Sequence, residues 1–415
     1  MVLNYVWIFF FVAAFVIAII KTIFPQVDAD HVIFKTLVDG LFDAAESSVM
    51  KVALPLTGVL TFFMGLLKIG EKAGAINFLS RLIGPFLTRL FPEVPKNHPA
   101  IGQMVMNFSA NLLGLDNAAT PFGLKAMQSL QELNPEKEKA SNAQIMFLVL
   151  HTSGLTLIPL TIMAYRASNG SHNVTSIFIP CVLATVIATL MSIFIVGAVQ
   201  KIKFDYVVCS WILGILCFVV FLIGMVDHMN PQQKDIFSNL FGNVLLLLIV
   251  VGFIVAGLIK KVHVFDAFIE GAKEGFDVVL KIIPYLVGLL VAVRVFRDSG
   301  ALQYVNDGIS YLLTLTGMNT DFVPALPVAL MKPFSGSGAR GLLLDIYKNP
   351  LYGPDSFVGN TASILQGSAD TTFYIIALYF GSVGIKNIRY AVWAGLLADF
   401  LGVIAAICIA YLFFH

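Results

Sequence analysis

Long apolar runs, separated by short polar segments, dominate the sequence. Eight of these runs are residues 2–24, 48–67, 143–165, 175–199, 207–226, 238–259, 278–295 and 391–414. Each holds about 20 mostly apolar residues, which is the length that a helix needs to cross the hydrocarbon core of a bilayer. The pattern predicts an all-α, polytopic membrane protein that has the lipid bilayer as a partner.

The composition supports this prediction. Of 415 residues, 58% are hydrophobic and 12% are charged, whereas soluble domains are about half apolar and a quarter charged. A net charge of +1 gives no hint of nucleic-acid binding, and we expect no nucleic-acid partner. The four cysteines lack the spacing of a disulfide framework or a zinc site, and the sequence predicts no metal and no cofactor.

One polar segment, residues 332–374, places Arg340 and Asp370 among serines, threonines and glycines. Glycine and serine disfavour a helix interior, so the stretch that begins at Ser335 suits a helix start. We expect a helix over about residues 339–347. Its first N–H groups would attract an anion.

Two further helix starts are predicted by capping residues. Ser368 is expected to cap a helix whose first turn holds Asp370 and Thr371. Earlier in the chain, Thr120 is expected to cap a helix with Pro121 at its first position. These helices are predicted to be broken, re-entrant half-helices that face a polar centre.

The two polar segments belong to an internal repeat. Residues 120–135 align without gaps to residues 335–350, an offset of 335 − 120 = 215, and the same offset relates residues 150–156 to residues 365–371. The alignment pairs Thr120 with Ser335, Lys125 with Arg340, Ser153 with Ser368 and, upstream, Gly74-Ala75 with Gly300-Ala301. We expect two related halves about a pseudo-twofold axis, and the sequence leaves open whether they are parallel or inverted.

The repeat sets the expected domain organisation. We expect an N-terminal transmembrane helix and linker, a first repeat, central transmembrane helices and a second repeat, over residues 1–40, 41–170, 171–262 and 263–415. The candidate solute site lies between the half-helices of the two repeats.

Lys125 and Arg340 occupy matched positions in the first turns of the expected helices, where a cation opposes the helix dipole by a few tenths to ~1 kcal/mol. Either they hold an anionic group of a solute, or each pairs with a nearby carboxylate, Asp116 or Asp370, and joins the broken helices. The two carboxylates could instead take a coupling proton or sodium ion. The candidate substrate-binding residues are Asn117, Thr120, Lys125, Thr152, Ser153, Ser335, Ser337, Arg340, Gln366, Ser368 and Thr371.

The motifs in these segments resemble a known bacterial family. The first half, through NLLGLDNAATPFGLKAMQ and LHTSGLTLIP, is similar to spore maturation protein A, and the second, through MKPFSGSGARG, YGPDSFVGNTAS and QGSADTTFYIIALYFGSVGIKNIRYA, is similar to spore maturation protein B. The chain therefore resembles a fusion of two members of the nucleoside recognition, or gate domain, family. The resemblance implies an integral protein of the bacterial inner membrane and, in spore formers, a role in dehydration of the spore core.

The functional expectation is a transporter or permease for a small polar solute, anionic or zwitterionic. The alternative is a non-transporting membrane scaffold in envelope or spore maturation. We expect no enzyme, because no nucleophile–base pair, zinc spacing or phosphate loop occurs in the sequence. Substrate, coupling ion and homo-oligomeric state stay open.

Overall fold

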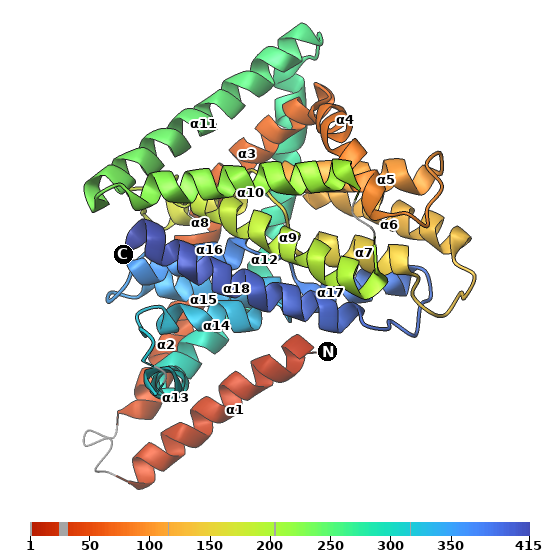
Figure 1. The fold of residues 1–415 in the computed structure, drawn as a ribbon. Helices are drawn as coiled ribbons and strands as arrows, with labels where there is room; N and C mark the ends of the chain where they lie inside the picture. The colour runs from red at the N-terminus through yellow and green to blue at the C-terminus, as the bar shows by residue number, and fades with distance from the viewer. Residues whose placement is uncertain (1, 25–31, 115, 203–204, 316) are drawn as a thin grey trace.

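The computed structural model describes residues 2–24, 32–114, 116–202, 205–315 and 317–415. Within these residues the fold is all-α, as predicted, and no β-strand occurs (Figure 1). Five helical stretches are long and apolar enough to cross a membrane: residues 33–72, 178–200, 206–226, 240–259 and 391–414. The protein is a multi-pass membrane protein.

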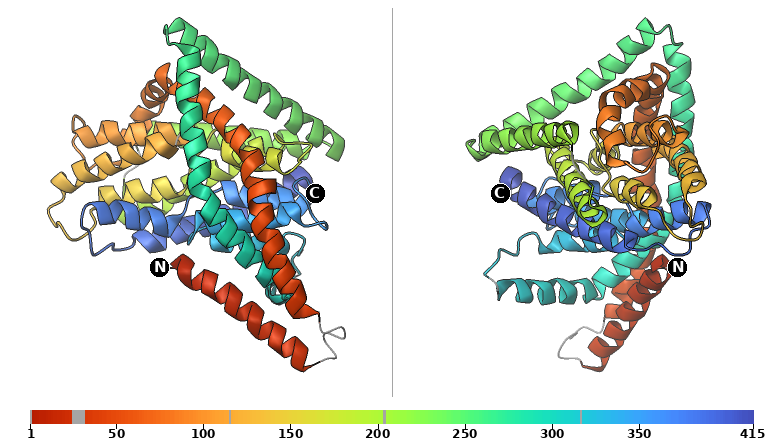
Figure 2. Two further views of the ribbon diagram at one scale, coloured as in Figure 1. Left: turned by 180° about the vertical axis from the view of Figure 1, so that it is seen from behind. Right: turned by 45° about the vertical axis from the view of Figure 1, so that its right-hand side comes forward.

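Two long helices, α3 (Leu54–Lys72) and α12 (Val264–Asp298), cross the molecule side by side (Figure 2). Glycine permits their close approach, because a Cβ at Gly271 would lie only 2.4 Å from the carbonyl oxygen of Met64. Helix α3 continues from α2 (Ile33–Ser47) through the π-helix η1 (Ser48–Ala53). The predicted spans at residues 48–67 and 278–295 are therefore parts of longer helices.

A second pair, α9 (Phe178–Gln200) and α18 (Ala391–Phe414), packs across the centre (Figure 1). Helices α10 (Tyr206–Asp227) and α11 (Pro231–Ile259) lie at the edge of the molecule. Only 11% of the apolar stretch within residues 240–259 of α11 is buried. An apolar helix with such exposure suits contact with lipid. Further elements are α1 (Val2–Ile23), α4 (Ala75–Leu87), η2 (Thr88–Leu90), α5 (Pro99–Leu112), α13 (Ala301–Thr314), η3 (Val323–Ala325) and α14 (Leu326–Met331).

The predicted span at residues 143–165 is wrong, because the chain breaks in its middle. Helix α7 (Asn142–Thr152) ends before residues 153–159, and α8 (Leu160–Ser168) follows them. Gly154 adopts a positive φ of 62° and lies against the backbone of Asp370, so a distant segment fixes the break. The apolar residues around the break hide it from a hydropathy pattern.

The second repeat contains the matching break. Helix α16 (Phe357–Gly367) is followed by α17 (Thr372–Ser382), and the bounds of α7 and α16 differ by 357 − 142 = 215 and 367 − 152 = 215. Their capping serines, Ser141 and Ser356, are also 215 positions apart. The offset found in the sequence is thus present in the helices.

The glycine pair upstream behaves in the same way. Gly74 and Gly300 precede α4 and α13 with φ of 89° and 88°. This left-handed conformation favours glycine, so the pairing predicted from the alignment has a structural equivalent.

The two broken elements run antiparallel. At one end, the backbone N–H groups of Lys386 and Asn387 donate to the carbonyl of Glu138, and at the other end Arg166 contacts Asp355. In the middle, the N–H of Asp370 donates to the carbonyl of Thr152 at 2.8 Å. In Figure 1, α7 lies with α17 and α8 lies with α16. This is the relation expected of inverted repeats, and a re-entrant path through the membrane stays a prediction.

Helices α6 (Asp116–Leu133) and α15 (Gly336–Lys348) end 348 − 133 = 215 positions apart but begin differently. The helix start predicted at the stretch from Ser335 is confirmed, and Ser335 caps it, since its hydroxyl accepts from the N–H of Gly338 at 3.0 Å. The cap predicted at Thr120 is wrong. Helix α6 starts four residues earlier, and the carbonyl of buried Ala119 in that extra turn accepts from Asn107 at 2.7 Å.

The cap predicted at Ser368 is also wrong. Ser368 follows the last residue of α16, and its hydroxyl donates to the carbonyl of Leu365 at 3.0 Å. Helix α17 begins only at Thr372. A serine hydroxyl can satisfy a carbonyl at a helix end as well as an N–H at a helix start, and the local sequence does not distinguish the two.

Two large buried apolar clusters flank the breaks. One contains residues of α5, α6, α7 and α17, such as Met127, Phe147 and Ile376. The other contains residues of α3, α8, α12, α15 and α16, such as Leu60 and Leu343. The polar centre therefore lies between two packed halves.

Candidate solute-binding site

A cavity of about 140 Å³ lies where the two helix breaks meet. Its polar lining comes from α5, the two breaks, α8, α9, the end of α14, α15 and α16. The polar residues are Asn111, Thr156, Thr161, Thr185, Lys332, Arg340, Gln366 and Asp370. For scale, an engineered cavity of about 150 Å³ admits benzene. The cavity thus suits a small solute.

Two cations face this cavity. Arg340 lies one turn into α15, where its Nε donates to the carbonyl of Gly336 at 3.2 Å. Lys332 donates from Nζ to the carbonyl of Gln366 at 2.7 Å, so it joins the end of α14 to the last turn of α16. A lysine at a helix C-terminus is favourable because of the helix dipole. The site can therefore attract an anionic group.

Asp370 and Gln366 supply acceptors on the same wall. The Asp370 side chain is 46% exposed, and its Oδ1 accepts from the N–H of Thr371 at 2.9 Å. Gln366 is only 4% exposed, and its Oε1 has no hydrogen-bond partner among the described residues. Since a buried polar atom without a partner is costly, Gln366 is suited to accept a hydrogen bond from a solute or a water molecule.

A buried histidine stands behind this wall. His151 is 5% exposed in the last turn of α7, and its Nε2 lies 4.0 Å from the Asp370 carboxylate. Asn107 and Asn111 each lie 3.0 Å from its Nδ1, and the Tyr379 hydroxyl lies 3.4 Å from Nε2. The sequence reasoning missed these residues. The repeat could have shown His151, because 366 − 151 = 215 pairs it with Gln366.

Three of the predicted substrate or ion residues line the cavity: Arg340, Gln366 and Asp370. The carboxylate of Asp370 lies beside His151, 4.0 Å from its Nε2. A pairing of Arg340 with a carboxylate stays a prediction.

Other predicted residues form the framework of the breaks. The hydroxyls of Thr152, Ser153 and Ser368 donate to carbonyls in the last turn of their own helices. Ser337 lies 3.2 Å from Ser335, and buried Thr371 touches the start of α15, since a Cβ at Gly336 would lie 2.7 Å from its hydroxyl. These residues position the site without lining it.

The first repeat contributes less than the alignment predicted. Lys125 is exposed on α6, and neither it nor half-buried Thr120 lines the cavity. The side chains of Asp116 and Asn117 lie outside the described residues. The matched cations therefore have unequal surroundings, which sequence equivalence cannot show.

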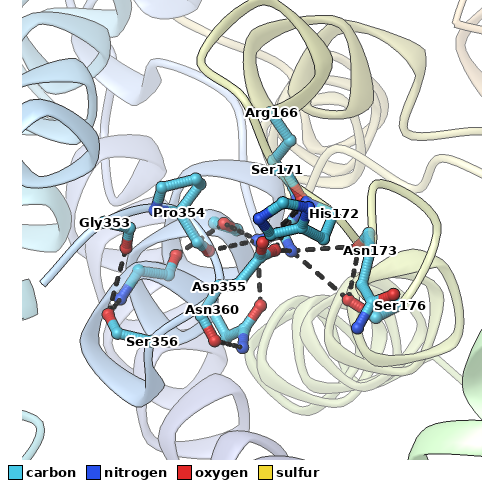
Figure 3. A network of polar contacts seen from close by, with 12 residues as sticks. Arg166, Ser171, His172, Asn173, Ser176, Gly353, Pro354, Asp355, Ser356 and Asn360 are labelled. Carbon is cyan, nitrogen blue, oxygen red and sulfur yellow. Dashed lines mark hydrogen bonds and ion pairs between the residues drawn. The ribbon is translucent and has the colours of Figure 1, made fainter.

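A second polar cluster joins the end of α8 to the loop before α16 (Figure 3). Arg166 is fully buried and donates to Asp355 at 2.8 Å, to the carbonyl of Pro354 at 2.7 Å and to Asn360 at 2.9 Å. We call this group the Arg166 cluster. The sequence reasoning missed it, because Arg166 and Asp355 are 189 residues apart.

Comparison with known proteins identifies the family. A sequence model described as nucleoside recognition, or gate, matches residues 53–168 and residues 279–386, which is more than half of the chain. The chain belongs to the nucleoside recognition family. The first matched segment contains α6 and the broken element α7–α8, and the second contains α15 and the broken element α16–α17. The family model and the internal repeat therefore cover the same parts of the molecule.

Two proteins from Bacillus subtilis (strain 168) are each similar to a part of this chain. Spore maturation protein B is 47% identical over 167 residues, which are 40% of this chain and 91% of the relative. Spore maturation protein A is 41% identical over 157 residues, 38% of this chain and 80% of the relative. The resemblance to a fusion is thus confirmed, and the chain is a multi-pass protein of the bacterial inner membrane. None of these three descriptions names a catalytic activity.

Proposed function

We propose that this protein is a transporter or permease for a small polar solute, anionic or zwitterionic, and that it is not an enzyme. The observation that carries the proposal is the cavity between two antiparallel helix breaks, with Lys332, Arg340 and Asp370 on its wall. Inverted repeats with broken helices at the site are common in secondary transporters.

The energetics of the membrane support this proposal. Backbone that leaves a helix at membrane depth is tolerated only when protein covers it or when it lines a water-filled cavity. A charged side chain at the centre of the bilayer costs about 2.5–3.5 kcal/mol on insertion scales. Three charged groups at the breaks therefore need a polar cavity, and a solute path supplies one.

The charges of the wall support the solute class. Lys332 and Arg340 offer cations to a carboxylate or phosphate, while Asp370 and Gln366 offer acceptors to an ammonium or hydroxyl group. Asp370 is also the candidate for a coupling proton or sodium ion, in agreement with its partial exposure to the cavity.

The test is uptake into proteoliposomes from a defined mixture of small organic acids, amino acids, amines and nucleosides. Protein-containing vesicles should accumulate a member of the acid or amino acid groups, and Arg340→Gln should abolish this uptake. Lys125→Gln is the control, because it removes the repeat-matched cation outside the cavity and should leave uptake within about twofold. Selective uptake of amines would reverse the charge assignment. A folded protein without any flux would favour the membrane scaffold.

A further inference from the structure

The hydrogen bonds of His151 determine which of its ring nitrogens can titrate. The side-chain N–H of Asn107 donates to the carbonyl of Ala119 at 2.7 Å, so the amide oxygen of Asn107 faces Nδ1 of His151 at 3.0 Å. An amide oxygen only accepts. Nδ1 of His151 must therefore carry a hydrogen in both the neutral and the charged ring.

The second amide at Nδ1 adapts to this assignment. The side-chain nitrogen of Asn111 lies 3.0 Å from Nδ1, and the two ends of an asparagine amide are interchangeable by a flip. A hydrogen on Nδ1 requires this flip, which turns the oxygen of Asn111 to the ring. Nε2 is then the nitrogen that gains or loses a proton.

Nε2 of His151 faces the cavity wall. Its neighbours are the Tyr379 hydroxyl on α17 at 3.4 Å and the carboxylate of Asp370 at 4.0 Å. Asp370 lines the cavity with a half-exposed side chain, so a proton in the cavity can reach Nε2 through it. Burial of the ring disfavours an imidazolium ion, whereas a carboxylate at this distance and the C-terminal end of α7 both stabilise it.

Three further charged side chains lie on the elements around His151 that the structure describes. Asp399 on α18 accepts from the Thr372 hydroxyl at 2.5 Å. Arg340 and Lys332 lie on the cavity wall. Helices α5 and α9 contribute amides and hydroxyls, such as Thr189 beside Ser153. The side chain of Asp116 on α6 lies outside the described residues. A cation on the cavity wall disfavours a charged His151, and an anion bound in the cavity favours it.

We propose that Nε2 of His151 and the carboxylate of Asp370 form a proton-binding site that is loaded together with an anionic group in the cavity. The part of this inference that concerns the anion rests on the proposed transport of a solute, whereas protonation of the His151–Asp370 pair does not. Binding linkage is reciprocal, so the anion favours the proton and the proton favours the anion. Combined with transport, this linkage makes the protein a proton-coupled carrier.

The experiment is solid-state NMR of the full-length protein in lipid, labelled with ¹⁵N- and ¹³C-histidine and titrated between about pH 5 and 8, the range of an ordinary histidine. The His151 signals are assigned by their loss in His151→Gln, which places the residue of the matched repeat position there. Nδ1 should carry a hydrogen throughout, and Nε2 should gain one as pH falls. A neutral ring with its hydrogen on Nε2 would overturn the assignment.

Asp370→Asn tests the pair. At a fixed pH it should lower the ratio of imidazolium to imidazole at His151 by about tenfold or more, as expected for loss of an opposite charge within about 4–6 Å. Asp307→Asn, which removes an exposed carboxylate of α13, is the control and should leave the ratio unchanged. Equal effects of the two substitutions would contradict the proposal.

Acetate, with acetamide as its neutral isostere, tests the linkage. Acetate should raise the imidazolium ratio of the wild-type protein, acetamide should not, and Arg340→Gln should remove the difference. Equal responses to both compounds would overturn the coupling. The NMR result does not depend on flux, so a protein that fails every uptake assay would refute transport while the proton site is judged separately.

Discussion

The Arg166 cluster permits a quantitative prediction about how the two halves are joined. Asp355→Asn keeps the shape of the side chain and removes the negative charge that faces Arg166 at 2.8 Å. The Arg166 side chain is fully buried, whereas 30% of the Asp355 side chain is exposed. The substitution leaves a buried guanidinium ion without its counter-charge.

The size of the effect follows from this burial. Removal of one partner from a buried ion pair typically costs about 3–5 kcal/mol. Water reaches Asp355 and the asparagine can still accept one hydrogen bond, so we expect the lower end, about 3 kcal/mol of the free energy of unfolding.

The opposite end of the broken elements provides a matched control. Lys386 and Glu138 form an ion pair there, but their side chains are 75% and 69% exposed. Glu138→Gln should cost less than about 1 kcal/mol, as for other surface pairs. Unfolding of both variants in mixed micelles, followed by circular dichroism, gives the two free energies. Equal losses within about 0.5 kcal/mol would refute the view that burial of Arg166 decides the energetics.

Three further predictions concern packing, caps and the guanidinium group. Gly271→Ala should destabilise the protein by about 1–3 kcal/mol, because its Cβ would overlap α3, whereas Gly58→Ala, with nothing within 4 Å, should be neutral or stabilising in the same unfolding assay. Ser141→Ala and Ser356→Ala should each cost about 1 kcal/mol, since each removes one cap from an equivalent helix; a large difference between them would contradict the equivalence. Arg166→Lys should lower the melting temperature nearly as much as Asp355→Asn, because lysine cannot donate to Asp355 and Asn360 through one planar fork, and a wild-type melting temperature would argue against this geometry.

The sequence predicted those features that depend on local pattern or on self-similarity. Apolar runs predicted the long helices, and the offset of 215 predicted the equivalence that α7 and α16 display at both ends. The start of α15 at Ser335 could be predicted because the neighbouring glycines and serine are poor residues for a helix interior. In the site, Arg340, Gln366 and Asp370 were predicted and do line the cavity.

The missed features depend on contacts between distant segments. Residues 153–159 look apolar enough to continue a span, and the break exists because Gly154 packs against the backbone of Asp370. The extra turn of α6 is held by Asn107 rather than by its own sequence. His151 is a single polar residue in an apolar run, and its importance follows only from the groups that the fold places around it.

Transport requires that the helix breaks enclose a water-filled path for a solute. Substituted-cysteine accessibility in sealed vesicles tests it directly, in a protein from which the four native cysteines have been removed. Thr156, which lines the cavity, and Val149, which is fully buried on α7, are each replaced by cysteine. We expect a small water-soluble thiol reagent to modify Thr156→Cys and block uptake, while Val149→Cys does not react. An unreactive Thr156→Cys from both sides of the membrane, or equal reactivity of the two cysteines, would contradict it.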